Sequence, residues 1–483
     1  MKNKPDNFHF QAKTALNNPS LQQALSKATT HILNKRARAI QELTDLETLR
    51  DRARRIKEQT IAQLNHYLLQ LESEVRKAGG KVYWAREARD AQRYIAKLVK
   101  QKKAQLVVKG KSMVSEEIGL NEYLEKLGLE VVETDLGEYI VQLAGERPSH
   151  IIAPAIHKSR EEVALLFQKK LGTNPEAEIS KLTQVARERL REKFFQADIG
   201  ITGANFAIAE TGTIVLVENE GNIRFTTSLP PVHIVLMGIE KVIPTLADLV
   251  VFLKLLPRSA TGQKLPSYVS LITGPRRDGE KDGPEELHLI ILDNGRSRIL
   301  SEPALRESLY CLRCGACLNI CPVYQKVGGH AYGSVYAGPI GSVITPPLVG
   351  LYRARALPYA STLCGACRDI CPVKINIPHM LLQLRQGLSY RWNRNLINPG
   401  YWLEKLLTIT WSMGMKDEGR YRFGSKVARL LQRPFLKKQK ISHLPYPFSR
   451  WTKSRDFTPL AAKPFRIWWE DNQRSSKDHE RAD

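Results

Sequence analysis

The sequence contains no uninterrupted apolar run of about 18 residues, which is roughly the length that a membrane-spanning helix requires. Its first residues, MKNKPDNFHFQAK, include no apolar stretch of the kind found at the centre of a secretion signal. These absences lead us to expect a cytoplasmic protein. The sequence also contains no H-E-x-x-H, no G-x-S-x-G and no G-x-G-x-x-G motif. Zinc protease, serine hydrolase and dinucleotide-binding functions therefore have no support.

Acidic residues are scarce relative to basic ones. The 483-residue chain has 73 Lys and Arg against 49 Asp and Glu, so its formal net charge is +24. Half of this excess lies near the end, because residues 381–483 contain 21 Lys and Arg and 9 Asp and Glu, a difference of 12. Such an excess is typical of proteins with an anionic partner. We expect this segment to dock on an acidic protein or an anionic membrane surface, and we rank nucleic acid third.

Cysteine is absent from most of the chain, and all seven cysteines lie within residues 311–371. A disulfide framework is not expected in a large cytoplasmic protein. The first group is a C-x2-C-x2-C-x3-C-P run, and the second is the same run without its first cysteine. The full run is the one that binds iron–sulfur clusters in bacterial ferredoxins. Zinc also uses C-x2-C pairs, but it does not account for two tight runs that each close on Cys-Pro.

In a ferredoxin run the fourth cysteine binds the other cluster. This rule assigns to cluster one, a [4Fe–4S] cluster, the thiols of Cys311, Cys314, Cys317 and Cys371. It leaves for cluster two the thiols of Cys321, Cys364 and Cys367. Ser361 stands where the missing cysteine would be when the two runs are aligned on Cys-Pro. Cluster two is therefore either [4Fe–4S] with a fourth ligand from Ser361, water or a partner, or [3Fe–4S].

A segment rich in glycine and tyrosine, GGHAYGSVYAGPIGS, separates the two cysteine runs. Glycines permit close backbone approach, so the segment either donates N–H groups to cluster sulfurs or forms an ordinary surface loop. We expect its histidine, His330, to be a hydrogen-bonding surface residue and not an iron ligand.

The pattern of apolar residues divides the chain into four parts. Residues 1–79 are predicted to be helical, with apolar residues at helical spacing between Leu46 and Leu71. Residues 80–300 alternate short strands with helices, which favours a mostly parallel sheet covered by helices on both faces. The expected strands include KVYWA, AQLVV, LEVVETD, HIIAPA and ELHLIIL, and residues 115–127 are expected to form one helix. Residues 301–390 carry the cysteines, and residues 391–483 form the basic C-terminal segment.

Three blocks of the sequence resemble the lactate utilisation protein B family. They are GITGANFAIAETGT at residues 200–213, the two cysteine runs, and PFSRWTKSRDFTPLAAKPFRIWW at residues 447–469. The first is similar to the signature of the LUD domain. The resemblance implies an α/β LUD domain, similar to the sugar-isomerase and CoA-transferase folds, followed by a mainly helical dicluster ferredoxin domain.

The resemblance also implies a function. Proteins of this family are expected to pass electrons while partner subunits oxidise L-lactate to pyruvate. The basic C-terminal segment leads us to expect an acidic electron acceptor as a further partner. We therefore predict an electron-transfer subunit of an L-lactate oxidoreductase complex. One alternative is a relay for another 2-hydroxyacid or quinone-linked oxidoreductase. A second alternative is a nucleic-acid-associated iron–sulfur protein.

No residue is predicted to be catalytic. Glu210 lies among apolar residues of the first block and is expected to have a structural role, paired with a cation or an amide. Asn205, Thr211 and Thr213 are candidates to line a pocket with it. The segment Lys109–Ser112 reads KGKS but lacks the earlier glycine of a phosphate-binding loop, and it is expected to be a solvated turn.

Overall fold

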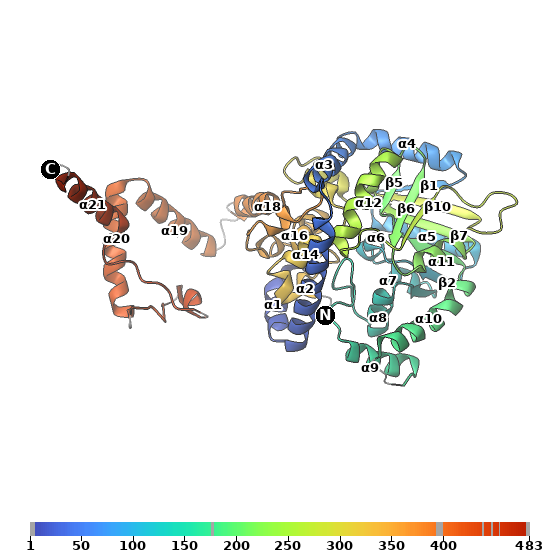
Figure 1. The fold of residues 1–483 in the computed structure, drawn as a ribbon, viewed down its shortest axis with the longest axis horizontal. Helices are drawn as coiled ribbons and strands as arrows, with labels where there is room; N and C mark the ends of the chain where they lie inside the picture. Colours follow the sequence, from blue (N-terminus) through green and yellow to red (C-terminus); the bar gives the residue numbers. More distant parts are fainter. Residues whose placement is uncertain are drawn as a thin grey trace. The chain divides into compact units, whose positions relative to one another are not determined.

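The computed structural model describes residues 5–174, 178–392, 399–436, 439–445, 448–453 and 455–479. The chain divides into two units, residues 1–389 and residues 390–483, and each is described by itself (Figure 1). In the described ranges, no helix is long and apolar enough to cross a membrane.

A parallel sheet forms the centre of the first unit (Figure 1). Its strand order is β1-β10-β7-β4-β2-β3, and every neighbouring pair is parallel. The strands are β1 (Lys81–Ala85), β2 (Leu106–Lys109), β3 (Glu130–Glu133), β4 (Ile199–Thr202), β7 (Val232–Gly238) and β10 (Glu286–Leu292). The predicted parallel sheet is therefore confirmed.

Both faces of this sheet are buried, because successive residues of each strand point to opposite sides. Ile290 and Leu292 of β10 pack in one core with Ile95 of α5. Leu289 and Ile291 of the same strand belong to a second core. Helices α5 (Ala88–Lys102), α6 (Met113–Glu117) and α7 (Leu120–Glu125) border the first core, while α10 (Ile179–Gln196) and α11 (Asn222–Ser228) contact strands β2 and β4.

A second, four-stranded sheet lies beside the first and was not predicted. Its order is β8-β5-β6-β9. The strands are β5 (Phe206–Ile208), β6 (Thr213–Glu218), β8 (Val242–Ile243) and β9 (Tyr268–Ile272). Phe206 stacks on Phe252 of α12 (Leu246–Ala260), with 5.1 Å between ring centroids. The block GITGANFAIAETGT spans β4, β5 and the start of β6, so it links the two sheets.

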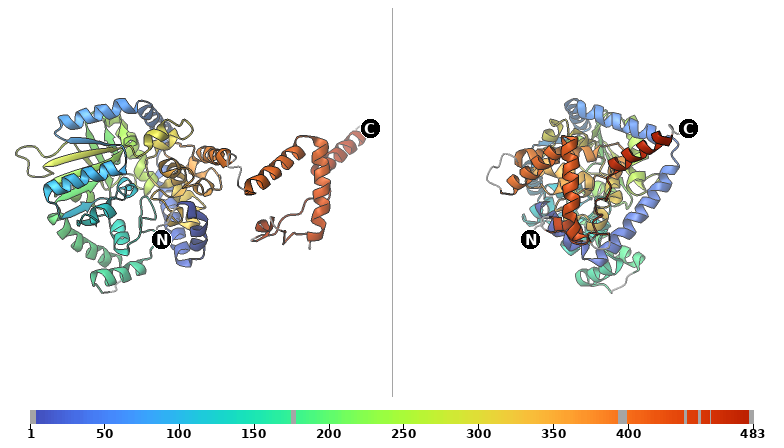
Figure 2. Two further views of the ribbon diagram at one scale, coloured as in Figure 1. Left: turned by 180° about the vertical axis from the view of Figure 1, so that it is seen from behind. Right: turned by 90° about the vertical axis from the view of Figure 1, so that its left-hand side faces the viewer.

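The N-terminal helices run along the outside of the first unit, from the cysteine region to the sheets (Figure 2). They are α1 (Phe8–Leu16), α2 (Pro19–Gln41), α3 (Leu46–Ala62) and α4 (Leu64–Lys77), preceded by the short 3-10 helix η1 (Pro5–Asn7). The predicted apolar stripe is split between α3 and α4 at Gln63. Helix α3 contacts both α12 and the cysteine region, so it spans two parts of the molecule.

The cysteine region is mainly helical, as predicted. Its α-helices are α13 (Arg296–Leu300), α14 (Ala316–Ile320), α15 (Tyr324–Val327), α16 (Gly338–Val349), α17 (Ala366–Asp369) and α18 (Ile377–Trp392). Its 3-10 helices are η3 (Arg306–Tyr310), η4 (His330–Tyr332) and η5 (Leu357–Tyr359). Helices α14 and α17, one from each cysteine run, pack against each other.

Two local predictions were wrong. HIIAPA, residues 150–155, lies wholly in the described part of the chain and forms no strand, because the His150 ring accepts the N–H groups of Ile152 and Ala153 and bends the backbone. Residues 115–127 form not one helix but α6 and α7, separated by Gly119 at φ 62°. Helices α8 (Leu136–Ala144) and α9 (Arg160–Leu171) flank the bent segment.

The second unit consists of α19 (Pro399–Met415), α20 (Glu418–Gln432) and α21 (Phe465–His479), with short 3-10 helices η6 (Arg433–Phe435) and η7 (Phe448–Thr452). Helix α20 buries none of its residues. Large apolar side chains such as Trp402, Trp411 and Phe423 are exposed, with relative exposures of 51%, 62% and 70%. Within this unit, apolar surface and basic charge therefore occur together.

Gly200, which opens the first sequence block, has a packing role that a variant can test. A Cβ at this position of β4 would lie 1.9 Å from the backbone oxygen of Thr226 in α11. We expect Gly200→Ala to lower the free energy of unfolding by about 3 kcal/mol, because backbone must move to make room. Chemical unfolding measures this. Gly387→Ala, whose Cβ would meet only Leu351 Cδ2 at 3.6 Å, is the control and should not destabilise. Equal unfolding midpoints for the two variants would contradict the packing role.

Candidate metal centre

Cysteines from both runs line one small cavity. The thiols are those of Cys311, Cys314, Cys317 and Cys371. The last cysteine of the second run thus lies with the first three of the first run. The rest of the wall is largely apolar and includes Ile151, Ile340, Val373, Ile375 and Ile377.

The other three thiols form a second group. Burial raises the pKa of Cys367 to about 12, and the neighbouring thiols of Cys321 and Cys364 add to that rise. Burial and the Cys364 thiol likewise raise the pKa of Cys321. The packing agrees, because α14, which ends directly before Cys321, contacts α17, which contains Cys367. Cys364 is the exposed member of the group.

The thiols of the first group also oppose one another's ionisation. Burial raises the pKa of Cys314 to about 12, and Cys371 and Cys311 contribute in the same direction. Burial raises the pKa of Cys371 to about 11, again with a contribution from Cys311. Thiolates, not thiols, are the metal ligands, so metal binding here has to release protons.

Backbone N–H groups point at these sulfurs. The N–H of Arg313 donates to Sγ of Cys311 over 3.4 Å. The N–H of Ile340, in α16, donates to Cys317. The groups that follow each Cys-Pro do the same: Val323 and Tyr324 donate to Cys321, and Val373 and Ile375 donate to Cys371. Such donors stabilise negative charge on sulfur.

The glycine- and tyrosine-rich segment between the runs is not a surface loop. Tyr332, Tyr336 and Ile340 are buried, and α16 supplies the N–H that reaches Cys317. Gly338 allows the close approach, because its φ is 69° and a Cβ there would lie 2.6 Å from Leu318 Cγ. Of the two alternatives, N–H donation to the site and an ordinary surface loop, the structure favours the first. His330 lies at its edge, where Nε2 donates to the Arg147 carbonyl over 2.6 Å, as expected for a hydrogen-bonding histidine.

Arginines of α2 and α3 cover the backbone beside Cys371. Arg36 Nη2 donates to the Ile370 carbonyl over 3.0 Å. Arg50 donates to the Cys371 carbonyl over 2.8 Å and to the Asp369 carbonyl over 2.7 Å. Sequence reasoning missed these residues because it assigned the helices to a separate N-terminal part. For Arg50 a signal was present in the run RDRARR, where Arg50 and Arg54 are four residues apart and so lie on one face of a helix.

A buried charged network adjoins the first thiol group. Arg296 pairs with Glu117 and Glu240, each over 2.7 Å. The Arg313 guanidinium stacks 4.4 Å above the Tyr336 ring and lies 3.6 Å from Glu240. Among the described residues, Arg313 Nη1 has no hydrogen-bond partner although it is buried. A buried donor without a partner beside Cys311 is what an anionic group in the thiol cavity would satisfy.

The residues present therefore fit an iron–sulfur cluster at the first group. Four thiols converge, the wall is largely apolar, backbone N–H groups face the sulfurs, and an unpaired guanidinium nitrogen lies beside them.

The bent segment at residues 149–156 joins the sheet domain to the cysteine region. The buried His150 donates from Nε2 to Asn319 Oδ1 over 3.1 Å, and Asn319 lies in α14 between two of the cysteines. The Tyr324 hydroxyl donates to the Ser149 carbonyl over 2.7 Å. Ile151 lines the thiol cavity. The segment predicted as a strand is instead the contact that holds the first cysteine loop.

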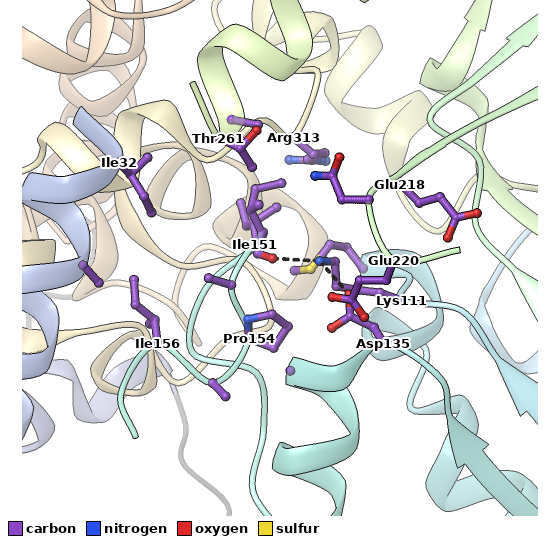
Figure 3. Close-up of a pocket in the computed structure, with 18 of the residues that line it drawn as sticks. Ile32, Lys111, Asp135, Ile151, Pro154, Ile156, Glu218, Glu220, Thr261 and Arg313 are labelled. Carbon is purple, nitrogen blue, oxygen red and sulfur yellow. Dashed lines mark hydrogen bonds and ion pairs between the residues drawn. The ribbon is translucent and has the colours of Figure 1, made fainter. Parts of the chain in front are cut away.

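A larger cavity of about 1220 Å³ lies between α2, the sheet domain and the first cysteine loop (Figure 3). Figure 3 shows charged side chains, Lys111, Asp135 and Glu220, on one side and Ile32 on the other. Lys111 donates to the Ile152 carbonyl over 2.8 Å and lies 3.4 Å from Asp135. Arg313 lines both this cavity and the thiol cavity.

The segment Lys109–Ser112 is not a solvated turn. Lys109 is fully buried and pairs with Glu133 over 2.7 Å and Glu116 over 3.2 Å. Ser112 caps α6 by accepting the Ser115 N–H. The prediction of a solvated turn was wrong because Lys109 finds its ion-pair partners on other elements, β3 and α6.

The residues of the first sequence block that were expected to line one pocket lie in different places. Glu210 is exposed, and its carboxylate accepts the Leu246 N–H over 3.1 Å, which is the structural role expected for it. Asn205 lines the larger cavity. The hydroxyls of Thr211 and Thr213 bond to each other over 2.8 Å, and neither residue lines that cavity.

Comparison with known proteins agrees with this arrangement. A LUD domain model matches residues 68–292, and a 4Fe-4S dicluster domain model matches residues 307–375. The chain is 45% identical to lactate utilization protein B of Geobacillus sp. (strain WCH70) over 98% of either chain. It is 45% identical to the Anoxybacillus flavithermus protein of that name, covering 97% of this chain and 98% of the relative. The Bacillus subtilis protein of that name is 44% identical, with 99% of each covered.

The buried His150 gives a prediction about pH. Burial lowers its pKa from 6.5 to about 4, so the folded chain binds fewer protons than the unfolded chain between these values. The contribution of the neutral His150 to the free energy of unfolding is therefore fully present above about pH 6.5 and is lost as the pH falls towards 4. We expect His150→Asn to lose about 2 kcal/mol less unfolding free energy than the wild type between pH 7.5 and 5. Anaerobic urea unfolding checks this, with the exposed His66→Asn as control. Equal losses in all three proteins would contradict it.

Proposed function

We propose that this chain, which belongs to the lactate utilization protein B family, binds two iron–sulfur clusters. Through them it relays electrons during the oxidation of L-lactate to pyruvate. That oxidation removes two electrons and two protons from lactate. Iron–sulfur clusters accept one electron at a time, so two of them in one chain match a two-electron oxidation carried out elsewhere in the complex.

The observation that carries this proposal is the exchange of one cysteine between the two runs. Cys371 lies with Cys311, Cys314 and Cys317, whereas Cys321 lies with Cys364 and Cys367. This is the exchange that the ferredoxin run makes when it holds two clusters. A chain built for two unrelated metal ions has no need of it.

The residues around the thiols have distinct roles in the proposed relay. The apolar side chains of Ile151, Ile340 and Ile375 keep water from the first site. The N–H groups of Arg313 and Ile340 stabilise negative charge on sulfur. The guanidiniums of Arg50 and Arg313 offset the charge that a reduced site carries, which favours acceptance of the electron.

We assign partner binding to the second unit. Its exposed tryptophans, Trp402 and Trp411, occur together with an excess of basic residues in the sequence. This composition favours a partner subunit of the lactate system or an acidic electron acceptor, since aromatic and arginine side chains are enriched in protein interfaces.

Two matched variants test which thiols share a cluster. In Cys371→Ala we expect the EPR signal of cluster one to be lost and that of cluster two to remain, while Cys321→Ala should show the reverse. Each variant should lose about half of the roughly eight irons that two cubanes contain. Anaerobic iron and sulfide analysis with EPR of the reduced proteins measures this.

The reverse pairing would contradict the assignment. If Cys321→Ala lost the same cluster as Cys311→Ala, each run would bind its own cluster without exchange. Zinc in place of iron in the wild type would contradict the electron-transfer function itself.

A further inference from the structure

The two cysteine loops have the same backbone conformation, although one lacks a cysteine. Arg313 and Leu363 both adopt left-handed φ angles, 60° and 56°, that are uncommon outside glycine. Each lies directly before the second cysteine position of its run. Gly315 and Gly365 follow at φ 74° and 87°, and a short helix then begins at Ala316 and Ala366.

Ser361 occupies the position that Cys311 has in the first loop. The Arg313 N–H donates to Cys311 Sγ over 3.4 Å. The Leu363 N–H donates to Ser361 Oγ over 3.1 Å. In both loops the donor is the residue two positions later, so the serine oxygen is placed against the backbone as the cysteine sulfur is.

The second loop contains a strained residue. A bulky residue at positive φ costs on the order of 1 kcal/mol, and Leu363 adopts such a conformation at φ 56°. Arg385 fixes the loop further, by donating to the carbonyls of Ser361 over 3.1 Å and Pro358 over 2.9 Å. The second loop therefore keeps the backbone geometry of a metal-binding loop, with Ser361 Oγ at the position of the first ligand.

We propose that Ser361 Oγ is the fourth protein ligand of the second cluster, together with the thiols of Cys321, Cys364 and Cys367. This inference rests on the proposed function. An Fe–O bond forms as the Ser361 O–H bond breaks, the proton leaves to solvent, and no electron is transferred. The Leu363 N–H then stabilises the bound alkoxide, as the Arg313 N–H stabilises the thiolate of Cys311. The second site accordingly holds a four-iron cluster.

Iron analysis and spectroscopy of Ser361 variants test this assignment without an activity assay. In the wild type and in Ser361→Cys we expect about eight irons per chain, and in Ser361→Ala about seven, with the EPR signal of an oxidised three-iron cluster. Mössbauer spectra of ⁵⁷Fe-enriched wild type should contain one iron that differs from the rest, and Ser361→Cys should abolish that difference. Thr362→Val is the control for loss of a hydroxyl in the same loop. That hydroxyl bonds to the Cys364 sulfur and is not a proposed iron ligand, so the variant should keep about eight irons.

The outcomes separate this inference from the proposed function. The EPR signal of cluster one in Ser361→Ala shows that the variant folds. If Ser361→Ala keeps all its irons and the wild-type spectrum, Ser361 is not a ligand. The proposal that the chain binds two clusters is then unaffected. A three-iron second cluster in the wild type would also overturn the assignment. If the wild type binds no iron, the proposed function itself fails.

Discussion

The structure depends on bringing thiols and their negative charge into a buried, largely apolar site. Burial, with a smaller contribution from the neighbouring thiols, raises the pKa of Cys314 to about 12 and that of Cys371 to about 11, so thiolates are disfavoured there. Compensation comes from three directions: backbone N–H groups, the arginines of α2 and α3, and Arg313. Metal binding completes it by replacing protons on sulfur.

That constraint explains why distant parts of the chain meet around the cysteines. Helices α2 and α3 are separated from Cys371 by more than 300 residues, as the contact between Arg50 and Cys371 shows. The segment around His150 comes from the sheet domain and holds α14 through Asn319. Arg296, Glu117 and Glu240 then tie the strand ends to the first cysteine loop through Arg313. The site is thus held by the N-terminal helices, the sheet domain and the cysteine region together.

The sequence was most informative where a pattern is local. Strand β1 was predicted to the residue as KVYWA, and the parallel sheet followed from alternating elements. Spacing grouped Cys371 with the first three cysteines, and these four side chains line one cavity; the clusters that they would hold stay a prediction. Three misreadings share one cause, which is a partner distant in sequence. Lys109 pairs with Glu133 on the next strand, His150 of HIIAPA bonds to Asn319 in α14, and α3 packs on the cysteine region and not only on its neighbours. The second sheet was missed because its strands are short.

In the proposed function, electrons from lactate pass through the clusters of this chain. The most direct measurement is freeze-quench EPR of the protein purified with its bound partner subunits and mixed anaerobically with L-lactate. We expect the signals of the reduced clusters to appear no later than pyruvate does, and to persist when no acceptor is supplied. Formation of pyruvate while both clusters remain oxidised would contradict the account.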